Sequence, residues 1–191
     1  MKKLSMTVVF LLLVSSAIYA HNGAISLYLD ETATQCSTTL LSGQADIMVL
    51  YIRGDGPYLG SGLEFRLLLS SPAAGSGVLF MDPTWSSQIV LTEGDIQTGI
   101  SLVGSTCLGV NSDIVYIGTV PIFNIGGDSD TFNVRVVDDP NVTSPGPGIY
   151  ILLCDAHKTK VPVLGGWFVF NGSCNPGVES KSWSAIKSMY R

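Results

Sequence analysis

The stretches Gly62-Leu-Glu-Phe-Arg-Leu-Leu-Leu69 and Thr131-Phe-Asn-Val-Arg-Val-Val137 alternate apolar and polar side chains, and they decide the fold class. In the first stretch, leucine or phenylalanine occupies every odd position, while Glu64 and Arg66 lie between them. A period of two residues is the signature of a β-strand with one buried face and one exposed face. Each stretch therefore predicts a half-buried strand, with Glu64 on the outward side.

Further strand-like segments surround these two and are separated by Gly, Pro, Asp and Ser. They are residues 24–30, 46–53, 78–81, 88–92, 99–103, 114–125, 148–154, 160–163 and 166–170. Short strands at regular spacing are typical of a sandwich or barrel. No segment before residue 178 has helical periodicity, which excludes a parallel α/β sheet. We predict an all-β, mostly antiparallel sandwich of the immunoglobulin-like or jelly-roll kind.

The first twenty residues predict export. Lys2 and Lys3 precede an apolar stretch over 6–14, and small residues lead to Ala20, which is the order of a cleavable signal peptide. The apolar stretch is shorter than the roughly 20 residues that span a bilayer, so an N-terminal membrane anchor is the weaker alternative. We expect a secreted protein, extracellular or periplasmic and not transmembrane after cleavage. The sandwich is predicted over 21–175, followed by a linker and short helix over 176–191.

The charge of the exported chain restricts its partners. Removal of Lys2 and Lys3 leaves 8 basic residues against the 15 acidic ones, which is a net charge of −7. No basic cluster is present, and both nucleic acids and anionic membranes are bound through Lys and Arg. A protein partner or an extracellular polysaccharide is expected instead.

Four cysteines follow the predicted cleavage site. An even count in an exported protein predicts two disulfides. Three pairings are open, and we favour Cys36–Cys107 with Cys154–Cys174. No Cys-x-x-Cys pair is present, so a zinc ribbon is not indicated.

The segment 179–191 has a different pattern from the rest of the chain. Ser182 is suited to cap a short helix, and Trp183, Ile186 and Tyr190 would share one face of it. A helix this short is marginal in water, so it must pack on its own domain or on another molecule. We predict that these three side chains face a partner, and that the sandwich folds without residues 182–191.

Two metal sites are conceivable from the residue types. His21 would become the mature N-terminus, and its amino group and imidazole together with His157 could chelate Cu(II) as a histidine brace. Asp128 and Asp130 lie in an acidic loop that could hold Ca²⁺. The simpler interpretations are two unrelated exposed histidines and aspartates that favour turns.

The residue types offer weaker signals for sugar binding and catalysis. Trp85 and Tyr58 lie in loop-like segments and could form a platform for sugar rings, although Trp more often packs at a core edge. No Gly-x-Ser-x-Gly elbow is present. Glu64, Glu93 and Asp95 could in principle serve as glycosidase carboxylates, but their context is that of a strand face and a turn. We therefore expect no catalytic residues.

Two parts of the chain resemble known groups of proteins. The opening Gly23-Ala-Ile-Ser-Leu-Tyr-Leu-Asp30 with Cys36, and the segment Trp183-Ser-Ala-Ile-Lys-Ser-Met-Tyr-Arg191, resemble a group of uncharacterised exported bacterial β proteins. The strand pair over 47–52 and 62–67 resembles the start of a cohesin module. This second resemblance implies a cohesin-like sandwich that acts by binding. The predicted function is a secreted or cell-surface binding or structural protein without catalysis; the alternatives are a copper protein and a carbohydrate-binding module.

Overall fold

The computed structural model describes residues 23–53, 60–70, 77–108, 114–126, 130–142, 146–157 and 159–174. Every regular element in these ranges is a strand, and none of them contains a helix that could cross a membrane. The strands are β1 Ala24–Tyr28, β2 Ser37–Thr38, β3 Ala45–Arg53, β4 Gly60–Leu69, β5 Val78–Phe80, β6 Thr84–Trp85, β7 Ile89–Asp95, β8 Gly99–Leu108, β9 Ile114–Asn124, β10 Phe132–Val137, β11 Tyr150–Leu153, β12 Lys160–Pro162, β13 Leu164–Gly165 and β14 Trp167–Phe170.

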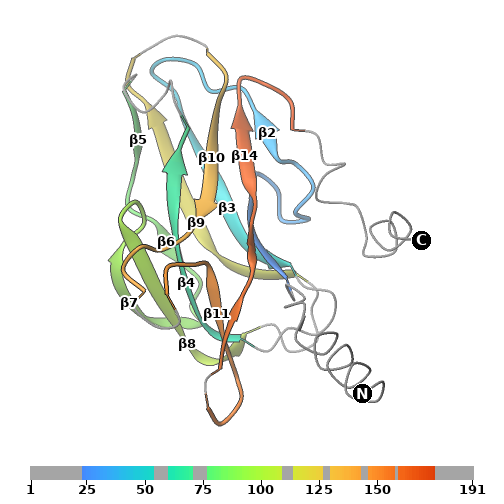
Figure 1. Ribbon diagram of the computed structural model, residues 1–191. Coiled ribbons are helices and arrows are strands. Elements are labelled where there is room, and N and C mark those ends of the chain that lie inside the picture. The colour runs from blue at the N-terminus through green and yellow to red at the C-terminus, as the bar shows by residue number, and fades with distance from the viewer. Residues whose placement is uncertain are drawn as a thin grey trace, which may run out of the picture.

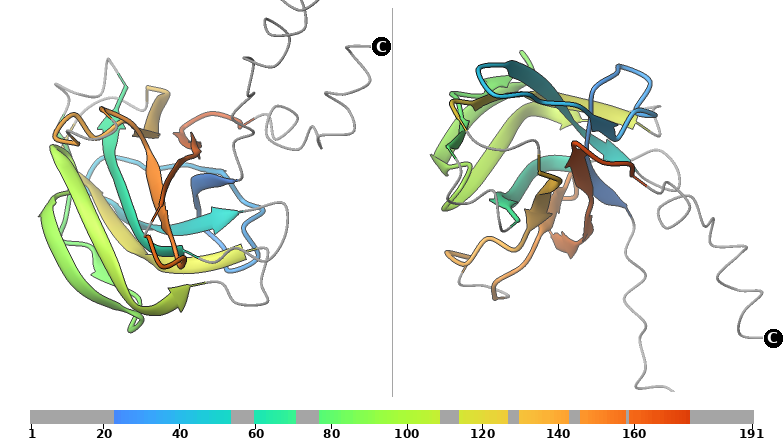
Figure 2. Two further views of the ribbon diagram at one scale, coloured as in Figure 1. Left: turned by 60° about the horizontal axis from the view of Figure 1, so that its bottom comes forward. Right: turned by 90° about the horizontal axis from the view of Figure 1, so that it is seen from above.

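The strands form two sheets that lie face to face (Figures 1 and 2). The first sheet has the order β13-β1-β3-β9-β5, and β6 also pairs with β9. The second has the order β12-β11-β4-β10-β14-β2, and β8 joins β4 to β7. The predicted all-β sandwich is confirmed. The short strands β2, β6 and β13 were not predicted, because two residues are too few to show a period.

The inward faces of both sheets form one core. Leu63, Phe65 and Leu67 of β4 are buried as their alternation predicts, and Met48 and Leu50 of β3 face them from the other sheet. Phe132, Phe168 and Phe170 close the core on the β10–β14 side, where the rings of Phe132 and Phe170 stack with centroids 4.8 Å apart. Fully burying an aliphatic or aromatic side chain contributes about 1.5–3 kcal/mol, so this core dominates the stability of the fold.

Two strand pairs are parallel, which the mostly antiparallel prediction did not specify. β1 pairs with β13 at Ala24↔Leu164, and β2 pairs with β14 at Val169↔Ser37. The beginning of the described chain thus enters the first sheet through β1 and the second sheet through β2. Both of these strands lie beside strands from the end of the chain.

The disulfide pairing differs from the prediction. Cys36 bonds to Cys174, and Cys107 bonds to Cys154. The physical reason is the parallel β2–β14 pair, which places Cys36 beside β14, where its carbonyl accepts a hydrogen bond from Val169 N–H. The chain then bends at Asn171 and Gly172, which lead to Cys174. The second bond joins the ends of β8 and β11, the two strands that pair with Gly60 at the start of β4.

Candidate functional site

The outer surface of the second sheet has a well-defined register around β4. We call it the β4 face. One row across the strands consists of Leu91, Val103, Gly62, Leu152 and Lys160, and the next consists of Glu93, Ser101, Glu64, Tyr150 and Pro162. Directly paired residues project to the same side of a sheet, so these side chains share one surface.

An ion pair lies at the centre of the β4 face. Lys160 Nζ is 2.8 Å from Glu64 Oε1 and 2.7 Å from Oε2, and the two side chains are 29% and 13% exposed. Lys160 Nζ also lies 5.9 Å from the centre of the Tyr150 ring. Within the described residues, Glu64 Oε2 is buried and has no further hydrogen-bond partner, and the ammonium group of Lys160 balances the charge of the carboxylate. Glu64 faces outward as predicted, but it is covered by a partner 96 residues away in sequence.

The β7 edge of the β4 face is apolar and exposed. Leu91 is 56% exposed and its neighbour Val90 is 63% exposed. Val103 lies beside Leu91 and is partly buried. The β4 face therefore combines an apolar edge with one partly covered ion pair, which is suited to contact with another molecule.

The outer surface of the first sheet carries a second exposed apolar patch, which we call the β3 strip. It consists of Ile47, Leu79, Met81, Pro121, Phe123 and Ile125. Phe123 of β9 lies between Ala45 and Leu79, and Pro121 pairs with Ile47 and accepts a hydrogen bond from the Met81 backbone N–H. Ile47, Leu79, Met81 and Ile125 are each 49–56% exposed.

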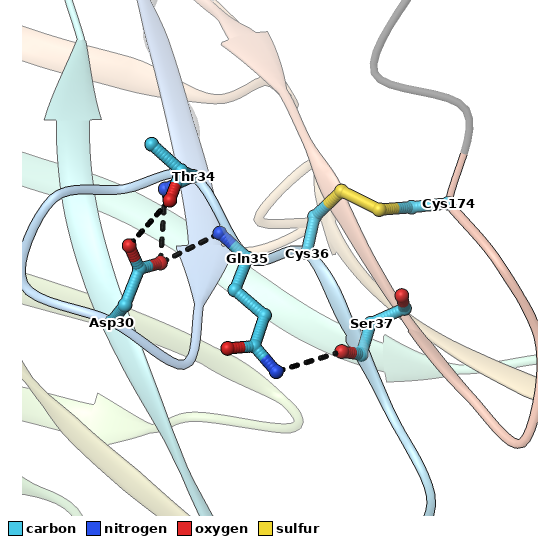
Figure 3. The surroundings of a disulfide bond; sticks show 6 residues. All are labelled: Asp30, Thr34, Gln35, Cys36, Ser37 and Cys174. Atoms are coloured by element: carbon cyan, nitrogen blue, oxygen red, sulfur yellow. Dashed lines mark hydrogen bonds between the residues drawn. A yellow bond between two sulfur atoms is a disulfide. The ribbon is translucent and has the colours of Figure 1, made fainter.

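Further along the same sheet surface, a second apolar cluster is covered by a loop. Tyr28 of β1 and Tyr51 of β3 are 3% exposed, and they pack with Ala33 and Cys36 of the loop. The Cys36–Cys174 disulfide fixes the end of this loop (Figure 3). The ring of Tyr116 lies 5.9 Å from that of Tyr51, which extends the cluster across β9.

Asp30 holds the covering loop in shape. Its carboxylate accepts hydrogen bonds from the backbone N–H groups of Thr34 and Gln35, at 2.9 and 2.6 Å, and from the hydroxyl of Thr34 (Figure 3). The hydroxyl of Thr32 also donates to it. Burial alone would raise the pKa of Asp30, but these hydrogen bonds outweigh it and hold the pKa well below its usual value. The carboxylate is thus a structural anchor of the loop. Burial together with the charges of Glu31 and Asp30 raises the pKa of Tyr51.

Known structures share this arrangement of strands. A cohesin module from a family 33 glycoside hydrolase of Clostridium perfringens matches with a TM-score of 0.53 and 10% identity, over 79% of this chain and 96% of that module. The fold is similar to that of a cohesin module. A non-cellulosomal cohesin of Archaeoglobus fulgidus gives a TM-score of 0.49, 12% identity and coverage of 83% and 96%. A cohesin–dockerin complex of Clostridium thermocellum gives 0.49, 8%, 82% and 97%.

Sequence comparisons do not assign the chain to a protein family. No protein-family model matches the chain, and no curated protein matches it. Because the structural matches have about 10% identity, the likeness concerns the cohesin-like fold alone.

The predicted metal and sugar residues do not come together in the described part of the chain. His157 lies exposed in the turn after β11, Asp130 is exposed before β10, and no group of three His, Cys, Asp or Glu in the described ranges could hold a metal ion. Trp85 is half-buried, packs against the main core and lies against Gly118. Packing against the core is sufficient to explain an aromatic side chain at this position. The role of Trp85 in sugar binding stays a prediction.

Several predicted site residues lie outside the described residues. These are His21, Tyr58, Asp128, Trp183, Ile186 and Tyr190. The copper site, the calcium site and the partner-facing segment therefore stay predictions.

The β3 strip and the position of Lys160 were not predicted from the sequence. A signal for the strip was present, because the residues of 46–53 are apolar at nearly every position rather than at alternate ones. A strand of that kind is typically covered on both faces. No local pattern connects Lys160 to Glu64, since the two strands are brought together only by the register of β11 and β12.

Proposed function

We propose that this protein is a secreted, non-catalytic interaction module that binds a protein partner through the β4 face. The observation that carries the proposal is the exposed apolar edge at Leu91 and Val90 on the same sheet surface as the partly covered Glu64–Lys160 pair. Protein interfaces commonly combine apolar contact area with a few oriented polar groups. The sheet also holds these side chains on a rigid frame, which lowers the entropy cost of association.

The cohesin-like fold and the two disulfides support this proposal. The matched Clostridium perfringens structure is a module of a glycoside hydrolase, and a modular binding role is what we infer for this chain. Two disulfides are typical of proteins that work outside the reducing cytosol, which agrees with the predicted signal peptide.

The test places a photo-crosslinking amino acid at Leu91 in the exported protein, within cells that make it. The matched control carries the same amino acid at Gln44, which is also exposed but precedes β3 of the other sheet. We expect one polypeptide to be crosslinked at position 91 and not at position 44. The adduct should disappear when Val103 in the same row is also changed to Asp.

Two results would contradict the proposal. One is the same mixture of adducts at both positions, which would indicate random collisions. The other is the absence of a protein adduct at position 91 together with retention on insoluble polysaccharide, which would favour a carbohydrate-binding module.

A further inference from the structure

The β3 strip lies on the sheet opposite the β4 face and has no covering element in the described part of the chain. Ile47, Leu79, Met81 and Ile125 are each about half exposed, and they are contiguous through Pro121 and Phe123. Soluble proteins rarely leave a contiguous apolar patch open unless something binds to it. We therefore expect another element to cover the strip.

The strip shares its sheet surface with the loop-covered tyrosine cluster. Val49 of β3 packs against that cluster, and it lies two residues from Ile47 on the same face of the strand. The covered and uncovered parts of this sheet surface are therefore continuous. The loop and its disulfide cover only the end of the surface near Tyr28 and Tyr51.

The disulfide also fixes where the rest of the chain emerges. Cys174 packs at the edge of the tyrosine cluster, held there by Cys36, and residues 175–191 follow it. Tyr51 and Ile47 are four residues apart on β3, which is about 13 Å along a strand. The nine residues 175–183 could extend to about 30 Å, so Trp183 is within reach of the strip.

The chemistry of residues 175–191 complements the surface. This segment carries Lys181, Lys187 and Arg191 against Glu179, a net charge of +2. Residues 21–174 carry 5 basic and 14 acidic residues, a net charge of −9. Trp183, Ile186 and Tyr190 would provide an apolar face for the strip, while the cationic side chains would lie over an acidic body.

We propose that residues 175–191 dock in the same molecule on the β3 strip, with Trp183 and Ile186 against Met81 and Ile47. The tether at Cys174 makes this contact intramolecular, so its effective concentration is in the millimolar range and exceeds that of a second copy. The segment thereby continues, over the β3 strip, the cover that the loop with Ala33 and Cys36 provides over Tyr28 and Tyr51. This inference goes beyond the proposed function, because it concerns the sheet opposite the β4 face.

The test is hydrogen exchange of the backbone amides of 175–191 in the full oxidised chain. We expect protection that does not depend on protein concentration. In Met81→Lys and in Trp183→Ala, exchange of this segment should accelerate about tenfold or more. The matched control is Leu91→Lys, an equally exposed leucine on the other sheet, which should leave the protection unchanged.

Three results would overturn the inference. Exchange of 175–191 at the rate of an unstructured peptide would show that the segment does not dock. Protection that rises with protein concentration would assign the strip to a second copy. Equal loss of protection in Met81→Lys and Leu91→Lys would show that the strip is not the contact. The absence of a protein crosslinked at Leu91 would contradict the proposed function, and it would leave the hydrogen-exchange rates of 175–191 unchanged.

Discussion

Removal of the Cys36–Cys174 disulfide tests the topology most directly. The perturbation is the double variant Cys36→Ala with Cys174→Ala, compared with Cys107→Ala with Cys154→Ala. The first bond closes a loop of 138 residues and the second a loop of 47. Crosslinks stabilise mainly by restricting the unfolded chain, and this effect grows with the logarithm of the loop length.

The loop lengths set the expected magnitudes. In the chain-entropy model, the longer loop contributes about 5 kcal/mol and the shorter loop about 4 kcal/mol. Cys36 is 7% exposed and packs on Tyr28 and Tyr51, so its truncation also removes buried contacts worth about 1 kcal/mol. The Cys36/Cys174 variant should therefore lose more stability by about 1–2 kcal/mol. Since domains are stable by about 5–15 kcal/mol, either loss is a large share of the total.

The assay is urea unfolding under non-reducing conditions, followed by tryptophan fluorescence and far-UV circular dichroism. Both variants should show a lower midpoint and a larger m-value, because the released unfolded chain is more expanded. A greater loss in the Cys107/Cys154 variant would refute the reasoning. So would a peptide map of the wild-type protein in which Cys36 is joined to Cys107.

Three further predictions follow from side chains already described. Asn171 has φ of 56°, and its side-chain amide hydrogen-bonds to both the N–H and the C=O of Leu40. Asn171→Ala should therefore lower the unfolding free energy by about 2–3 kcal/mol, and Asn171→Gly, which tolerates the positive φ, by about 1–2 kcal/mol. Equal losses in thermal unfolding would contradict the contribution of the positive φ. Lys160→Met leaves the partly buried Glu64 carboxylate without a counter-charge and should lower the unfolding free energy by about 2 kcal/mol. Adding Glu64→Gln should restore most of this loss. Additive losses of the two substitutions in chemical denaturation would contradict the stabilising role of the ion pair. The lowered pKa of Asp30 stabilises the fold above the unfolded pKa of about 3.9, and this stabilisation is lost as the pH falls below that value. Between about pH 5 and pH 2, the melting temperature should therefore fall more steeply in the wild type than in Asp30→Asn. Parallel curves for the two proteins would contradict the role of Asp30 as the anchor of the loop.

The strand positions were largely predictable because they depend on local alternation. β4 and β10 follow from leucine, phenylalanine and valine at every second position, and the structure buries those positions. Residues 46–53 were predicted as a strand as well, but the second apolar face of that strand was overlooked. Local pattern thus predicts where a strand lies and, when both faces are considered, whether it is covered on one side or two.

The pairing of distant segments could not be predicted in the same way. The parallel contacts of β1 with β13 and of β2 with β14 join residues more than 130 positions apart, and no periodicity within one segment encodes them. The disulfide prediction was wrong for this reason, since Cys36 meets Cys174 only after β2 and β14 are aligned. The Glu64–Lys160 pair depends on register in the same way.

The Cys36–Cys174 bond has a mechanical consequence. If a force pulls on the chain before β1 and beyond Cys174, tension passes from the short segment 23–36 through the two sulfur atoms and leaves at residue 174. The 137 residues between the two cysteines then bear almost no load, because a covalent bond carries the force around them. Only β1 remains in the force path, and its parallel contact with β13 and antiparallel contact with β3 would be sheared along their length. A module tethered at both ends could thus hold two bodies together under tension while the β4 face keeps its shape.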